Sequence, residues 1–210
     1  MSYEKGLEIL LSSITPYEKV EKIALTECLN RILACDISAP NDCPAFATAS
    51  MDGYAIRHAE QENALKIIGS LPAGTTPKFT PQKNECVKTF TGSLMSADFD
   101  TLVPVENVSV ENGVLTIHEK VPLNFAVRGV GESYKKGEIL LTKGTKLGFS
   151  EIALLAELGF FHISVFVKPV VGVLSSGDEL KDLGEILENP AQIRSSNHIA
   201  LANLAKSFGA

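Results

Sequence analysis

Three stretches of this sequence carry residues whose types and spacing could do chemistry. The first, residues 50–57, reads SMDGYAIR and contains an acid, a phenol and a guanidinium. Asp52-Gly53 is a common turn dipeptide, because Gly accepts the positive φ that other residues resist. A tight turn would present Asp52, Tyr54 and Arg57 close together. Local chemistry leaves two interpretations open: a solvated acid in a turn, or an acid that belongs to a site.

The second stretch, residues 170–180, reads VVGVLSSGDEL. A continuous apolar run is typical of a buried parallel strand, and open α/β sheets bind ligands beyond the carboxyl ends of such strands. Gly177 would let a ligand approach the backbone closely. Asp178 and Glu179 could hold a divalent cation such as Mg²⁺, which favours carboxylate and phosphate oxygens. The alternative is that these two acids only begin and cap the next turn.

The third stretch, residues 194–197, reads RSSN and precedes a helix that we predict over 198–208. The N–H groups and the dipole of a helix N-terminus favour anions, so this stretch could hold a phosphate. The alternative is an ordinary N-cap at Ser196 or Asn197. Residues 128–133, RGVGES, could form an anion-binding nest, but the strand and helix of a dinucleotide fingerprint are missing. A domain-junction loop explains them at least as well.

The elements that must position these residues follow from hydrophobic periodicity and from turn residues. The elements predicted near the two ends of the chain are helices over 3–13, 27–33, 151–158 and 198–208 and strands over 20–25, 136–141, 163–167 and 170–174. Ser2 and Ser150 are the predicted N-caps of the first and third helices. We expect the first two helices to share a domain with residues 134–168.

Residues 38–130 have a different sequence pattern, in which short apolar runs are bounded by Gly, Pro, Asn and Ser. The predicted strands are 53–57, 64–69, 85–90, 101–104, 108–111 and 114–117. Asn112-Gly113 between the last two is typical of a two-residue hairpin. The sequence therefore predicts a multidomain α/β protein with a split α+β linker domain (1–38 plus 132–168) and an inserted antiparallel β domain (39–131). A third, α/β domain starts at 169–210, and we expect the chain to be a fragment because one strand and one helix cannot cover a sheet.

Composition limits the classes of partner. The net charge of −6 argues against nucleic acid, which is bound by clustered Lys and Arg, whereas a small anion remains compatible. No signal peptide and no apolar run near the length of a membrane span is present, so we expect no membrane partner. The four cysteines lack metal spacing and indicate reduced thiols of a cytoplasmic protein. The four histidines show no catalytic or metal spacing and are interpreted as surface or packing residues.

Five motifs, taken in their order along the chain, resemble those of the molybdopterin molybdenumtransferases. They are SMDGYA at 50–55, TG at 91–92, RGVG at 128–131, SGDEL at 176–180 and SN at 196–197. These transferases are the MoeA-type enzymes, similar to the E domain of gephyrin. The resemblance implies a homodimer that inserts molybdate into adenylylated molybdopterin with Mg²⁺ and releases AMP. It also implies that residues 169–210 start a molybdopterin-binding three-layer α/β domain, and that this chain is the N-terminal fragment of a longer one. A molybdopterin-adenylyltransferase and molybdoenzyme targets are the implied partners.

Site roles are implied position by position. The residues implied to be catalytic are Asp52, Thr91 and Glu179. The residues implied to bind substrate are Ser176, Gly177, Asp178 and Asn197, and those implied to bind metal are Asp178 and Glu179. In the implied dimer, Asp52 and Thr91 of one subunit face the α/β domain of the other.

One departure leaves a second function open. Where the family pattern reads Arg-x-x-Gly-Glu-Asp, this chain has Ser133, which cannot supply the charge of the family's active-site Asp. The alternative is a non-catalytic scaffold of the same family that binds pterin or a partner peptide. A competence-damage-type nucleotide hydrolase is less favoured, because it would not explain the SMDGYA β domain. The motifs are compatible with molybdenum and with tungsten.

Overall fold

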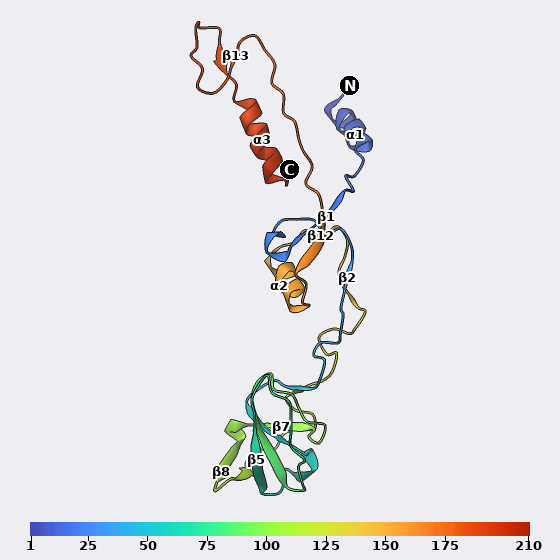
Figure 1. Ribbon diagram of the computed structural model, residues 1–210, viewed down its shortest axis with the longest axis vertical. Helices are drawn as coiled ribbons and strands as arrows, with labels where there is room; N and C mark the ends of the chain where they lie inside the picture. The colour runs from blue at the N-terminus through green and yellow to red at the C-terminus, as the bar shows by residue number, and fades with distance from the viewer. The chain divides into compact units, whose positions relative to one another are not determined.

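The computed structural model describes all 210 residues, which form two compact units (Figure 1). Unit 1 comprises Met1–Ile37 together with Ile139–Ala210, and unit 2 comprises Ser38–Glu138. Unit 2 is thus inserted, in sequence, between two halves of unit 1. Helices and a curled sheet occur in one chain, which confirms the predicted mixed α/β class. The three predicted domains and their boundaries stay a prediction.

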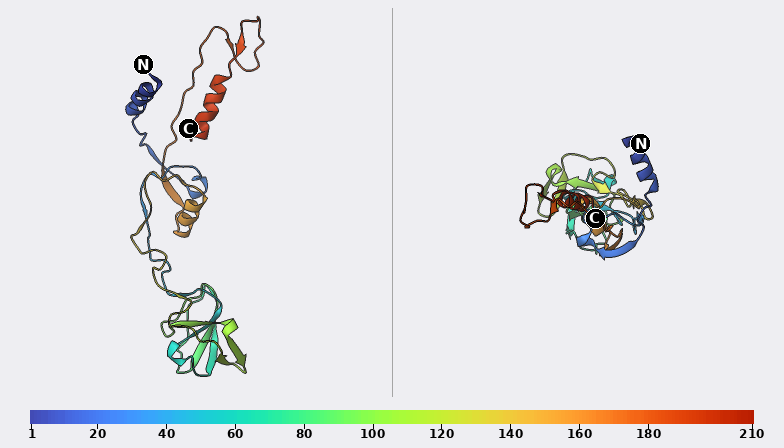
Figure 2. Two further views of the ribbon diagram at one scale, coloured as in Figure 1. Left: turned by 180° about the vertical axis from the view of Figure 1, so that it is seen from behind. Right: turned by 90° about the horizontal axis from the view of Figure 1, so that it is seen from above.

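Unit 2 is built on a six-stranded sheet with the strand order β7-β4-β6-β5-β9-β8. Figure 1 labels its strands β5, β7 and β8, and Figure 2 shows the same unit from behind. Its strands are β4 (Gly53–Ile56), β5 (Leu65–Leu71), β6 (Glu85–Thr89), β7 (Thr101–Pro104), β8 (Val108–Glu111) and β9 (Val114–Ile117). All six predicted strands form. Asn112 and Gly113 both adopt positive φ between β8 and β9, which is what a two-residue hairpin turn of this kind requires.

Central strand β4 is buried on both faces. One face packs Ala55 in a cluster around Val87 and Leu102, and the other packs Tyr54 and Ile56 in a second cluster. Burial on both sides explains why this strand reads as an almost continuous apolar run instead of an alternating one. The sheet therefore fixes the residues immediately before β4 and after β6.

The predicted β domain is not purely antiparallel, because β5 and β6 pair in parallel. Parallel neighbours need a connection that returns along the length of the strand, whereas a short turn produces antiparallel ones. Residues 72–84 supply that connection, and Phe79 within it packs against Gly69 of β5, where an added Cβ would lie 2.4 Å from the ring. The sequence did not reveal this pairing because the connection carries no regular helix.

The core of unit 1 lies between a β-ribbon and a helix. Strand β1 (Val20–Ala24) pairs antiparallel with β12 (His162–Phe166), and α2 (Phe149–Glu157) covers a cluster that includes the fully buried Leu33 and Leu155. The N-cap of α2 is Gly148, whose N–H donates to the Glu151 carboxylate, so the predicted cap at Ser150 is displaced by two residues. Gly159 ends the helix with φ of 84°.

The remaining elements are short. They are α1 (Tyr3–Ser13), β2 (Ile37–Ser38), β3 (Thr48–Ala49), β10 (Val127–Arg128), β11 (Ile139–Leu141), β13 (Leu180–Lys181), β14 (Ile193–Arg194), α3 (Asn197–Ser207) and the 3-10 turns η1 (Leu25–Glu27), η2 (His58–Glu60) and η3 (Val105–Asn107). Ser2 caps α1 as predicted, because its hydroxyl accepts from the N–H of Lys5 at 3.3 Å. None of the helices is both long and apolar enough to span a membrane.

The helix predicted over residues 27–33 does not form. Only the short turn η1 forms there, and Asn30 takes φ of 64°, which no α-helix accommodates. The N–H of Leu33 donates instead to the carbonyl of Thr145 at 2.9 Å, and Leu33 bridges to Val165 of β12. Pairing with distant strands has overridden the local helical spacing of the leucines.

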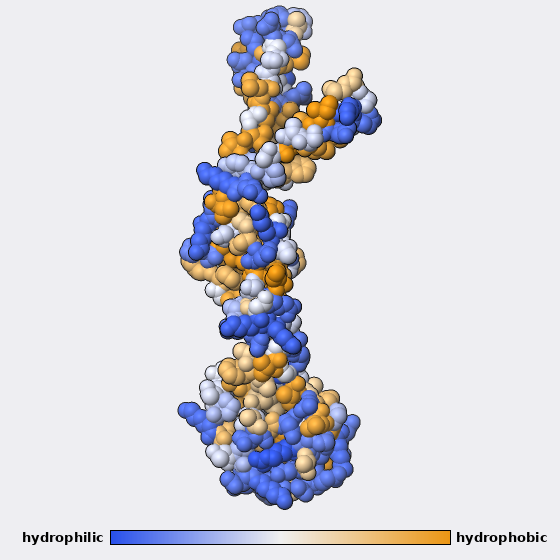
Figure 3. All heavy atoms as spheres, turned by 90° about the vertical axis from the view of Figure 1, so that its right-hand side faces the viewer, coloured by the Kyte–Doolittle hydropathy of each residue, from blue (hydrophilic) through white to orange (hydrophobic).

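The strand predicted over residues 170–174 is also not formed. Val170 and Leu174 are 99% and 95% exposed, and no strand partner lies beside them. A buried parallel strand needs neighbours on both edges, and in this region only the two-residue strands β13 and β14 pair, with each other. Leu10 and Leu11 of α1 are also exposed, each at 59%. Figure 3 shows hydrophobic residues in orange on the surface of the protein.

Candidate functional site

The acid of the SMDGYA stretch is held in place by one residue. Both hydrogen bonds go to Oδ1 of Asp52, from the Thr91 N–H at 2.9 Å and from the Thr91 hydroxyl at 3.0 Å. The backbone bond first, and then the hydroxyl bond, lower the pKa of Asp52, and the positive charge of Lys88 adds a smaller contribution. Asp52 is therefore an exposed, ionised carboxylate with one oxygen directed by the loop and the other free for a ligand.

Gly53 serves this site by its size and not by its turn geometry. It begins β4 and is not among the glycines with positive φ, so the predicted turn ends one residue earlier, at Asp52. A Cβ on Gly53 would lie 2.3 Å from the carbonyl oxygen of Val103 and 2.6 Å from Cδ2 of Leu102. The glycine lets β7 approach closely, and this contact fixes where Asp52 leaves the sheet.

The loop that carries Thr91 is anchored by a buried serine. Ser93 is fully buried; its hydroxyl donates to the carbonyl of Leu71 at 2.7 Å and accepts from the N–H of Phe90 at 3.0 Å. Gly92 takes φ of 81°, and its N–H donates to the carbonyl of Ala49 at 2.8 Å. Sequence reasoning missed the role of Ser93, which is visible only once β5 lies beside the loop.

The other two groups of the first stretch point elsewhere. Tyr54 is buried, which raises the pKa of its phenol. Arg57 donates to the carbonyls of Pro81 and Gln82 and forms an ion pair with Glu60 at 3.5 Å. The prediction that a turn would gather Asp52, Tyr54 and Arg57 is therefore wrong, and Arg57 stabilises the approach to β6 instead.

The Arg128–Ser133 loop of unit 2 is filled by its own side chains. The Arg128 guanidinium donates to the Ser133 hydroxyl at 2.6 Å and to Glu132 at 3.4 Å, while the Gly129 N–H donates to Glu132 at 2.9 Å. A carboxylate thus already occupies the place that an anion would take in a nest. The structure supports the loop interpretation of this stretch.

The second and third stretches come together in unit 1. A cavity of about 370 Å³ is lined by Gly177, Ser195 and His198 together with side chains of the 173–185 loop. Four of the predicted ligand residues, Ser176, Asp178, Glu179 and Asn197, are not among the residues that line it. The carboxylate of Glu179 folds against Gly177, where an added Cβ would lie 2.5 Å from Oε2, so this glycine leaves room for the acid.

Two residues of this cavity were not predicted as a pair. Ser195 is only 6% exposed, and its Oγ lies 2.6 Å from Nδ1 of His198, while Nε2 of His198 lies 3.9 Å from the carboxylate of Asp182. Ser195 follows β14 and lies two residues before α3, and His198 is the second residue of that helix, so the two are three residues apart. That spacing was the available signal.

The acids of the 175–179 loop fit a metal only in part. Asp178 and Glu179 are exposed, and no group of three or more His, Cys, Asp or Glu side chains is arranged to hold a metal ion. Mg²⁺ commonly takes one or two carboxylates and completes its shell with water and substrate phosphates. The donor set of these two acids therefore suits a cation that arrives with a phosphate ligand.

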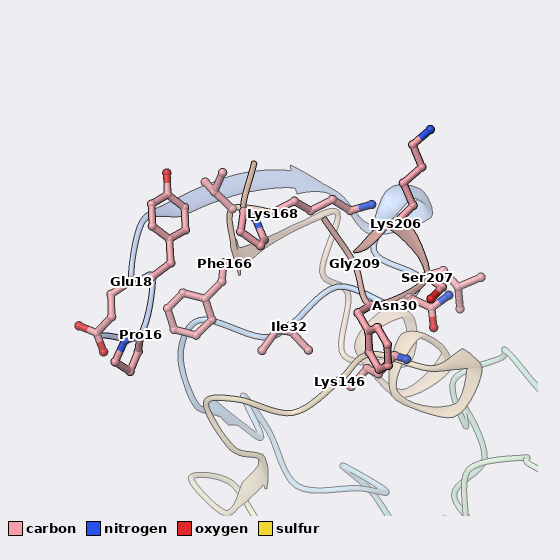
Figure 4. Close-up of a pocket in the computed structure, with 15 residues that line it drawn as sticks. Pro16, Glu18, Asn30, Ile32, Lys146, Phe166, Lys168, Lys206, Ser207 and Gly209 are labelled. Carbon is pink, nitrogen blue, oxygen red and sulfur yellow. The ribbon is translucent and has the colours of Figure 1, made fainter. Parts of the chain in front are cut away.

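A larger cavity of about 820 Å³ in unit 1 contains none of the predicted site residues (Figure 4). The lysines that line it are Lys146, Lys168 and Lys206, and its acid, Glu18, pairs with Lys143 at 3.5 Å. The C-terminal end of α3 also lines it and carries the negative end of the helix dipole, which the lysines offset. No histidine or cysteine lines this cavity.

Comparison with known proteins gives the family. The profile described as the MoeA N-terminal region (domain I and II) matches residues 1–159, and the chain belongs to this family. A molybdopterin molybdenumtransferase from a Nostoc species is 36% identical, over 96% of this chain and 48% of its own, and one from Haemophilus influenzae is 33% identical, over 90% and 48%. The chain thus spans about half the length of these curated relatives.

Solved structures agree with the family assignment. Two crystal structures of a molybdopterin biosynthesis MoeA protein from Pyrococcus horikoshii are similar to the whole of this chain. One has a TM-score of 0.85 at 35% identity with 55% of its chain covered, and the other has 0.91 at 31% with 57% covered. The resemblance read from the ordered motifs is therefore confirmed.

Proposed function

We propose that the protein acts in molybdenum cofactor synthesis, in the cytoplasm, by inserting molybdate into adenylylated molybdopterin with release of AMP. Two lines of support come from the family and from unit 2. The curated relatives carry the name molybdopterin molybdenumtransferase. The observation that carries the proposal is the Asp52–Thr91 pair, an ionised acid held by two hydrogen bonds at the SMDGYA motif.

The reaction releases AMP when water cleaves one P–O bond of the pyrophosphate. A phosphate monoester remains on the pterin. Both substrates are anionic, so the site must balance negative charge as the bond breaks. Asp178 and Glu179 would hold Mg²⁺, which supplies charge neutralisation at the phosphates when bound. Ser176, Gly177 and Asn197 contact the pterin phosphate through their hydroxyl, backbone N–H and amide groups.

Asp52 and Thr91 work on the opposite side of the substrate. The Thr91 hydroxyl donates to Asp52 and keeps lone pairs that accept a hydrogen bond from the substrate. Asp52 stays ionised because the two donors stabilise its charged form. The free carboxylate oxygen then accepts a hydrogen bond or a proton from the reacting group.

The site is completed by dimerisation. In the homodimer, Asp52 and Thr91 of one subunit meet Glu179 of the partner subunit. Residues 1–38 and 132–168 form the linker domain, 39–131 the inserted β domain, and 169–210 the start of a three-layer α/β domain that binds molybdopterin. A molybdopterin-adenylyltransferase supplies the substrate, and molybdoenzymes take the product.

The test is AMP release from adenylylated molybdopterin by the full-length protein, measured by chromatography with and without molybdate. We expect Asp52→Asn and Glu179→Gln each to lower the rate by about 10²-fold, which is typical of removing one positioned acid-base or electrostatic group. Glu111→Gln, at an exposed acid of the β8–β9 hairpin, is the matched control and keeps the wild-type rate. Unchanged rates in both site variants would refute the assignment.

Ser133 favours a second function, a non-catalytic scaffold of the same family. Its neutral hydroxyl receives a hydrogen bond from Arg128 where the family pattern carries an acid. Ser133→Asp separates the two functions, with Ser133→Asn as the uncharged control. A gain of AMP release in the Asp variant alone identifies a weakened enzyme. Pterin binding without any gain identifies the scaffold.

A further inference from the structure

A lysine lies on the same sheet face as Asp52, on the neighbouring strand. In the antiparallel pair β4–β6, Gly53 is opposite Thr89 and Tyr54 is opposite Lys88. Continued by one residue, this register places Asp52 opposite Phe90, and Lys88 becomes the diagonal neighbour of Asp52. Diagonal pairs have Cα atoms about 7–8 Å apart, a distance that long side chains bridge.

The Lys88 ammonium has no ion-pair partner within the protein. Lys88 forms no ion pair, whereas Lys66 on the adjacent strand β5 pairs with Glu85 at 3.9 Å. The ammonium of Lys88 lies 5.5 Å from the centroid of the Phe90 ring, which is a cation–π contact. Its positive charge is close enough to help lower the pKa of Asp52. Lys88 is thus a half-exposed cation beside the site, oriented by an aromatic ring.

An anionic substrate needs such a cation here. Asp52 is ionised and exposed, and a lone carboxylate repels an oxyanion. The hydroxyl and the N–H of Thr91 are both committed to Asp52, so they cannot donate to a second anion at the same time. The nearby ammonium offsets the charge of Asp52 and offers donors of its own.

We propose that Lys88 is a third residue of the Asp52–Thr91 site and that its ammonium binds a tetrahedral oxyanion of the substrates. This inference rests on the proposed function, and it adds a residue that none of the site motifs contains. The oxyanion is either molybdate or a phosphate of adenylylated molybdopterin. Lys88 acts by binding and positioning, while Asp52 and Thr91 face the reacting group.

The experiment is steady-state AMP release by the full-length protein carrying Lys88→Met, Lys88→Arg or the control Lys66→Met. Loss of one charge-assisted hydrogen bond predicts a rise in one KM of about tenfold with little change in kcat. A rise in the KM for molybdate identifies molybdate as the ligand, and a rise for the pterin nucleotide identifies its phosphate. Lys88→Arg keeps the low KM, and Lys66→Met matches the wild type, because Lys66 serves only Glu85.

Binding measurements separate this inference from the proposed function. Calorimetric titration of the same proteins with molybdate and with inorganic pyrophosphate needs no turnover. Weaker binding of either probe by Lys88→Met, at an unchanged melting temperature, supports the inference even if the wild type releases no AMP and the proposed function fails. Equal binding by wild type and Lys88→Met, or unchanged KM values in an active enzyme, overturns the role of Lys88.

Discussion

Replacing Gly53 by Ala tests the contact that positions Asp52. The new methyl group would lie 2.3 Å from a backbone carbonyl oxygen of β7, and that oxygen cannot rotate away as the end of a flexible side chain would. The second obstacle, Cδ2 of Leu102, belongs to a fully buried residue of the sheet core. The steric overlap of the new methyl group can therefore be relieved only if β4 and β7 move apart.

The expected penalty lies at the upper end of the range for overpacked cores, about 3 kcal/mol of the free energy of unfolding of unit 2. For a domain of this size such a loss lowers the melting temperature by about 12–24 °C. The displaced strand also shifts Asp52 away from Thr91. The pKa of Asp52 therefore rises in Gly53→Ala toward its ordinary value.

Differential scanning calorimetry measures the melting temperature, and Gly129→Ala is the matched control. Gly129 lies in the same unit, has no atom within 4 Å of an added Cβ and does not require positive φ. Its replacement leaves the stability unchanged or slightly higher, because alanine restricts the unfolded chain. Equal melting temperatures for the two variants would show that β4 and β7 are not held together at Gly53.

Three further predictions concern the acid, the thiols and the core of unit 1. Thr91→Val removes one of two hydrogen bonds to Asp52, so the pKa of Asp52 rises, as measured by a carbon NMR titration, while Thr91→Ser keeps this pKa low. Identical pKa values in the wild type and both variants would contradict the pairing. Because the folded pKa is the lower one, the pair stabilises the fold above the ordinary value of 3.8, and that contribution disappears as the pH falls through the folded pKa. Burial raises the pKa of Cys86 to about 12. Alkylation of the native protein, followed by mass spectrometry, should therefore modify exposed Cys35, and Cys86 should react only after unfolding. Equally fast reaction of both thiols would show that Cys86 is accessible. Leu155→Ala empties a fully buried position and lowers the free energy of unfolding by about 2–5 kcal/mol in urea, whereas Leu11→Ala on the exposed face of α1 has little effect; similar losses would contradict the location of the core.

Structural features that depend on neighbouring residues were predicted correctly from the sequence. The strands of unit 2 follow from short apolar runs bounded by turn residues, the Asn112-Gly113 hairpin follows from residues that tolerate positive φ, and both are observed. The parallel pairing of β5 with β6 was missed, because strand order depends on contacts far apart in sequence. The failed helix near Leu33 has the same cause, since β12 and the 145–147 segment take its backbone groups.

The site was predictable in part. Asp52 was singled out by its neighbours, but its link to Thr91 came only from the resemblance of the ordered motifs, since the two residues are 39 positions apart. Gly53 was assigned to a turn because a sequence shows the residue and not the strand that approaches it. Ser195 and His198 were not predicted as a pair, because the sequence shows only that they are three residues apart and not that their side chains form a hydrogen bond.

The most direct test of the account is a mixture of two inactive variants, one carrying Asp52→Asn and the other Glu179→Gln. The two proteins are unfolded, mixed and refolded together, and AMP release is measured. If Asp52 of one subunit serves Glu179 of the partner subunit, each mixed dimer of a two-fold pair has one intact site, and the mixture recovers about a quarter of the wild-type activity. A mixture as inactive as either variant alone would contradict the shared site.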